Sequence, residues 1–60
     1  MSERYWLFVH LFQLLDSLFD SDNRAFIFRE CLIRAADDPE ISISEYVKLM
    51  HFADQLLGRV

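Results

Sequence analysis

The chain has very little of the residues that build loops and cross-links. Its 60 residues include one cysteine, one glycine and one proline. A single cysteine cannot form an intrachain disulfide, which excludes a disulfide-stapled secreted mini-protein and favours a reducing cytosol. One glycine cannot build a phosphate-cradling loop, and no G-x-S-x-G nucleophile motif occurs. We therefore expect no catalytic residues, no cofactor and no enzymatic activity.

Long hydrophobic runs and positive charge are also scarce. The apolar stretch from Tyr5 to Leu15 is broken by His10 and Gln13, well short of the ~20 apolar residues of a membrane span. No basic region precedes this stretch and no small-residue cleavage site follows it, so we expect neither a secretory signal nor a membrane anchor. The formal net charge of −4 disfavours generic binding to nucleic acids. These absences predict a cytoplasmic protein.

Apolar side chains, in contrast, are abundant. Hydrophobic residues make up 53% of the chain and aromatic residues 15%, against a usual apolar fraction of ~45–50%. A chain this short buries only about 60% of the surface that its unfolded form exposes. The combination predicts an excess of apolar surface that needs a partner.

The first predicted helix, residues 3–20, carries two adjacent apolar seams at helical spacing. One seam is Leu7, Leu11, Leu14 and Leu18, and the other is Tyr5, Phe8, Phe12, Leu15 and Phe19. Together they cover about half of the circumference, more than the ~100° stripe of a helix with one neighbour. Trp6 and Val9 fall among the polar residues of the opposite face.

Two further helices are predicted over residues 23–36 and 42–57. Ser21 or Asp22 is expected to cap the second helix, whose main apolar stripe is Phe28, Cys31, Leu32 and Ala35. Pro39 follows it and cannot continue it. Ser42 and Glu45 have capping-box spacing at the start of the third helix, and Gly58 suits a left-handed C-cap. The expected stripe of the third helix is Ile43, Tyr46, Val47, Met50, Ala53 and Leu57, widened by Leu49 and Leu56.

These elements predict an all-α fold in one domain, residues 1–60: a small three-helix bundle, or a helical hairpin plus a third helix, that forms a homodimer. The expected dimer interface is Leu7, Leu11, Leu14, Leu18, Phe26 and Ile33. The alternative is that one seam of the first helix only packs the third helix within the chain. Trp6 and Val9 are the expected anchors for an external protein partner.

Other chemistries fit the sequence less well. Cys31, His10 and His51 lie on three different helices without zinc-site spacing, so no metal site is expected. The D-x-D at Asp20 and Asp22 lacks the glycine and glutamate of a calcium loop. A helix-turn-helix DNA-binding regulator remains the alternative function, although the exposed face of its third helix would be nearly neutral.

The opening MSERYWLFVHLFQLLDSLFDSDNRAFIFRE resembles the small accessory proteins of lambdoid temperate phages, which are encoded between the recombination and excision genes. The resemblance rests on length, acidity, helicity and this opening stretch. It implies a non-enzymatic protein in the cytoplasm of a bacterial host. Such a protein would bind a host or phage protein and influence the choice between lysis and lysogeny.

Overall fold

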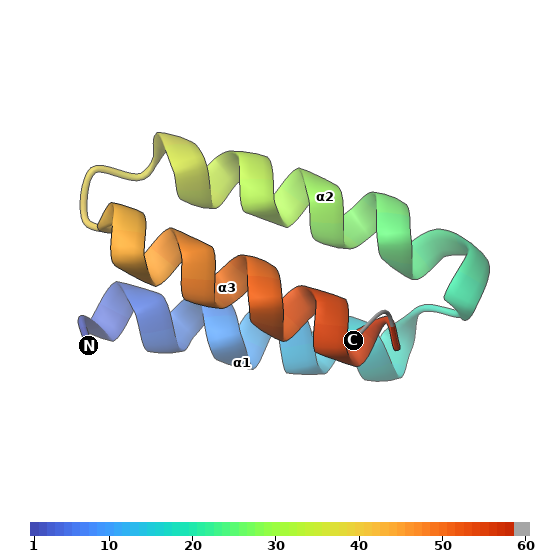
Figure 1. Ribbon diagram of the computed structural model, residues 1–60. Coiled ribbons are helices and arrows are strands. Elements are labelled where there is room, and N and C mark those ends of the chain that lie inside the picture. Colours follow the sequence, from blue (N-terminus) through green and yellow to red (C-terminus); the bar gives the residue numbers. More distant parts are fainter. Residues whose placement is uncertain (59–60) are drawn as a thin grey trace.

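The computed structural model describes residues 1–58, apart from the side chain of Ser21. It contains three helices, α1 (Glu3–Leu18), α2 (Ser21–Asp37) and α3 (Ile43–Leu56), and no strand within that part of the chain. All three helices pack against one another in a bundle of 30 × 20 × 17 Å (Figure 1). The expectation of an all-α three-helix bundle is therefore confirmed.

Short polar side chains begin each helix. Ser2, Asp20 and Ser42 are the N-caps, and each side chain accepts a hydrogen bond from a backbone N–H in the first turn. The Ser42–Glu45 capping box is present as predicted. The cap of α2 is Asp20 and not Ser21 or Asp22. The turn between α1 and α2 still has two residues, but it lies at residues 19–20 and not at residues 21–22 as the sequence indicated.

The ends of the helices follow the expected breakers. α2 ends at Asp37, and Asp38 is the C-cap directly before Pro39, which disfavours helical geometry in the residue that precedes it. Gly58 has a φ of 76°, the left-handed conformation that a glycine adopts after a helix with least strain.

The core takes side chains from all three helices, namely Val9, Phe12, Phe28, Ala35, Leu49 and Ala53. Phe12 is fully buried and makes edge-to-face contacts with Phe28 of α2, at a ring-centroid distance of 5.1 Å, and with Phe52 of α3, at 6.5 Å. Edge-to-face rings attract because the positive edge of one meets the negative face of the other. Phe12 therefore joins the three helices at one point.

The third helix is rotated relative to the predicted stripe. Leu49 and Ala53 lie in the core, but Ile43 is 85% exposed, and Val47 and Met50 are also exposed. The periodicity of the sequence placed the apolar stripe of α3 about one residue position around the helix from the face that packs on α1 and α2. The inward side of α3 also includes Glu45, whose carboxylate is bonded to Ser2 at the start of α1.

Candidate interaction surfaces

The first candidate surface lies on α1. Leu7, Leu11, Leu14 and Leu18, here called the leucine row, have spacings of four, three and four residues and so share one side of the helix. Their side chains are 38% to 67% exposed. Four residues of the other seam pack inward, with Phe12 buried and Tyr5, Phe8 and Leu15 against the core, whereas Phe19 follows the end of α1 and is 38% exposed. The leucine row is therefore the seam that no element of the chain covers within residues 1–58.

The second candidate surface lies on the side of α2 and α3 that faces away from α1. Its members are here called the outer face: Phe26, Arg29 and Ile33 of α2, and Ile43, Val47, Met50 and Asp54 of α3. Apart from the two charged residues, all of them are large apolar side chains that the fold leaves exposed. Spacings of three or four residues on each helix align the two rows.

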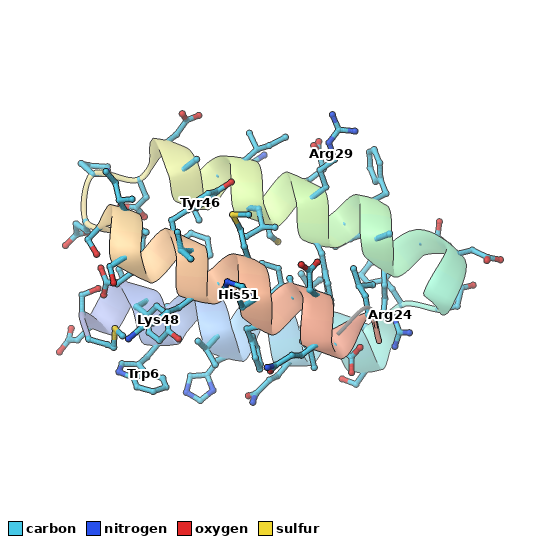
Figure 2. The ribbon with its side chains drawn as sticks, viewed as in Figure 1. Trp6, Arg24, Arg29, Tyr46, Lys48 and His51 are labelled. Carbon is cyan, nitrogen blue, oxygen red and sulfur yellow. The ribbon has the colours of Figure 1, made fainter. Side chains whose placement is uncertain are left out.

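A groove of about 620 Å³ lies between these two rows. Phe26, Arg29 and Ile33 line it from α2, and Met50 and Asp54 line it from α3. Buried Phe28 and Ala53 lie at its base. No residue of α1 contributes to the described lining of the groove. Figure 2 shows Arg29 projecting from the edge of α2 that faces away from α1.

The six residues of the predicted dimer interface are therefore divided between two surfaces. The four leucines belong to α1, whereas Phe26 and Ile33 belong to the outer face. Adjacent residues of a helix differ by about 100° in direction, and this spacing turns the leucine row roughly 130° away from buried Phe12. The six residues stay a predicted dimer interface, and the structure places them on two different surfaces of the described chain.

The two predicted partner anchors, Trp6 and Val9, also differ in burial. Val9 is 8% exposed and belongs to the core, so its predicted place on an exposed face is wrong. The bundle covers a wider arc of α1 than its seams indicated, because α2 and α3 both pack on this helix. Trp6 remains 50% exposed and packs edge-to-face on Tyr5. It projects from the edge of the molecule opposite Arg29 in Figure 2.

The sequence patterns did not predict one polar contact between helices, which is made by the carboxylate of Glu45. The Glu45 carboxylate accepts hydrogen bonds from the Ser2 backbone N–H and hydroxyl, both at 2.8 Å, and from the Ser42 N–H at 2.9 Å. These donors hold the pKa of Glu45 down to about 2. Ser2 in turn accepts from the Tyr5 N–H. The carboxylate thus joins the N-termini of α1 and α3, and only its bond to Ser42 could be predicted.

Two groups of ion pairs fix the ends of the bundle. Arg24 binds Asp16 at 2.8 Å across the turn between α1 and α2, while its Nε is buried and has no hydrogen-bond partner among the side chains that the structure describes. Arg4 binds Glu40 at 2.6 Å and Asp38 at 3.3 Å at the opposite end. The carboxylates at the turns therefore serve to hold helix ends together.

Other residues that the sequence singled out lie apart. Cys31 is half-buried beside the core, where burial raises the pKa of its thiol. His10 and His51 are exposed on different helices. Within the described residues, no three metal-ligating side chains come together, and no helix has the length and apolar character needed to cross a membrane.

The arrangement of α2 and α3 bears on DNA recognition. The two helices run alongside each other in opposite directions (Figure 1). In a helix-turn-helix they cross at about 90–120°, so that the second can enter the major groove. Comparison of the chain with protein-family models, curated proteins and solved structures found no match.

Proposed function

We propose that this chain is a non-enzymatic protein-binding module that docks a helix of another protein against its leucine row. The observation that carries the proposal is the exposure of four leucines at positions i, i+4, i+7 and i+11 of one rigid helix. Apolar anchors at this spacing are typical of helix-to-helix and helix-in-groove recognition. A row one side chain wide fits a single partner helix.

The surroundings of the leucine row favour a protein over a nucleic acid. The net charge of the chain is −4, and the Arg4 and Arg24 guanidinium groups are already paired with carboxylates. Binding to DNA gains most of its affinity from cations that neutralise phosphates. A leucine surface gains affinity from apolar area instead. Trp6, on another side of the same helix, is proposed as an additional anchor.

The resemblance of residues 1–30 to accessory proteins of lambdoid phages supplies a biological setting for the proposal. The partner is then a host or phage protein in the bacterial cytoplasm, and its capture shifts the choice between lysis and lysogeny. The module works as a homodimer in this setting, since a chain of 60 residues gains stability from a second copy.

The test compares two double variants that each replace two aliphatic side chains with serine. Leu11→Ser with Leu14→Ser removes the middle of the leucine row, and Ile43→Ser with Val47→Ser changes the outer face. A protein captured from bacterial lysate by the wild type is purified and titrated calorimetrically against each variant. We expect a loss of affinity of at least about tenfold for the first variant and little change for the second.

Three results would count against the proposal. One is equal binding by both variants, and another is loss of binding only in the Ile43 and Val47 variant. The third is binding to duplex DNA at low salt that weakens steeply with added salt, because that behaviour identifies phosphate contacts. In infected bacteria, expression of the wild type but not of the leucine-row variant should change the frequency of lysogens.

A further inference from the structure

We infer that the outer face of α2 and α3 is the dimer interface of this protein, with a second copy packed face to face so that each α2 lies over the α3 of the other copy. This inference deepens the proposed function, because it leaves both leucine rows free for partner helices. It rests on the area of the face, on its charges and on its separation from the leucine row.

Area distinguishes the two candidate surfaces. A standard interface buries ~800 Å² on each partner, and the broad side of a bundle of 30 × 20 Å offers on the order of 600 Å² in projection and more when side-chain relief is counted. The outer face spans two helices and exposes five large apolar side chains, among them Phe26 at 62% and Ile43 at 85%. The leucine row spans one helix and exposes four. The outer face is therefore the larger apolar surface of the two and the one better suited to a second copy.

The charges of the outer face make it complementary to itself. It carries one cation on the α2 wall of the groove, Arg29, and one anion on the α3 wall, Asp54. Within residues 1–58, neither takes part in an ion pair or a side-chain hydrogen bond. A two-fold axis parallel to the groove places Arg29 of each copy over the α3 wall of the other, where Asp54 lies. One dimer then contains two such pairs, because a two-fold interface repeats every contact.

The same charges disfavour the other two-fold arrangement. An axis across the groove lays α2 on α2, so that Phe26 packs on Ile33 of the second copy. Arg29 lies between these two residues in the sequence and would then meet its own counterpart. Like charges placed opposite each other lower affinity and suppress that register. Arg29 and Asp54 therefore select the arrangement with α2 over α3.

The decisive experiment exchanges the two charges. The variant Arg29→Glu places a carboxylate opposite Asp54, and the variant Asp54→Arg places a guanidinium opposite Arg29, so each variant alone should dimerise about tenfold more weakly than the wild type. An equimolar mixture of the two restores an attractive pair in a mixed dimer. We expect sedimentation equilibrium to show near wild-type association for the mixture and for the double variant. Far-UV circular dichroism of each variant establishes that it is folded.

The outcomes separate this inference from the proposed function. A wild type that stays monomeric at about 100 µM, or a dimer that the single variants leave unchanged, overturns the outer face as the interface. A dimer that Leu11→Ser with Leu14→Ser dissociates while Arg29→Glu does not would assign the interface to the leucine row. Failure of the mixture to associate beyond its components overturns the pairing of Arg29 with Asp54. Partner binding by the monomeric single variants measures the proposed function independently of the dimer.

Discussion

The two apolar seams of α1 have similar spacing but differ in burial. One contributes Phe12 to the centre of the bundle, with Phe8 and Leu15 beside it, whereas the leucine row stays exposed. The difference lies in the side chains. Phe12 reaches both Phe28 and Phe52, and so fills the space where three helices meet. A leucine is too short to contact both rings, so aromatic volume selects the inward seam.

The largest expected effect on stability comes from removing the buried ring of the inward seam. Phe12→Ala removes a fully buried ring that joins all three helices and should cost about 3–5 kcal/mol in the free energy of unfolding. A core of this size supplies little more than that, so we expect loss of cooperative unfolding. The matched change Leu14→Ala, on the exposed seam of the same helix, should stay within about 0.5 kcal/mol.

Thermal and urea melts of the two variants measure this contrast directly. Equal destabilisation by Phe12→Ala and Leu14→Ala would mean that the leucine row is buried in the folded species. That result would favour a dimer through the leucine row over one through the outer face.

The sequence predicted the helices well because their signals are local. The capping box at Ser42, the stop before Pro39 and the left-handed Gly58 depend on residues close together in the chain. The cap of α2 was predicted one or two residues too late, because Asp20, Ser21 and Asp22 are all good N-cap residues. The faces were harder to predict, since they depend on how three helices rotate against one another. Val9 and Ile43 were misplaced for this reason. The contact between Ser2 and Glu45, 43 residues apart, has no local signal at all.

A second pair of variants compares the two predicted anchors on α1. Val9→Ala removes methyl groups from the core and should cost about 1–2 kcal/mol in the free energy of unfolding. Trp6→Ala removes a half-exposed ring and loses its contact with Tyr5, with an expected cost below about 1 kcal/mol. Urea unfolding should be followed by circular dichroism for both variants. Trp6 is the only tryptophan, so Trp6→Ala has no tryptophan fluorescence to follow. A larger cost for Trp6→Ala than for Val9→Ala would contradict the assigned burial.

The buried carboxylate of Glu45 makes a prediction about pH. Its pKa is about 2 in the folded chain against an ordinary value of 4.5. A lowered pKa stabilises the fold fully above the ordinary value, and this contribution is lost as the pH falls from about 4.5 towards 2. Glu45→Gln keeps a capping side chain but cannot titrate. We therefore expect the stability difference between wild type and variant to shrink between pH 5 and pH 2.

Denaturant melts of both proteins at several pH values provide the measurement. The titration of the other carboxylates contributes equally to both stabilities and so cancels in their difference. A gap between wild type and Glu45→Gln that stays constant with pH would mean that Glu45 titrates normally. Ser2→Ala should reduce the same pH dependence without changing any charge, because it removes one of the donors to the carboxylate.

The smallest expected effect concerns the end of the bundle, where α1 turns into α2. The pair of Asp16 with Arg24 is partly exposed, and such pairs contribute about 0.2–1 kcal/mol. A double-mutant cycle with Asp16→Asn and Arg24→Met should give a coupling energy in this range that decreases in 1 M salt. Arg24→Met also removes the buried Nε, which has no hydrogen-bond partner within the described part of the chain. Its own cost should therefore fall below that of Asp16→Asn, which leaves the guanidinium in place. The reverse order of costs would show that the stem of Arg24, rather than its charge, holds this turn to the core.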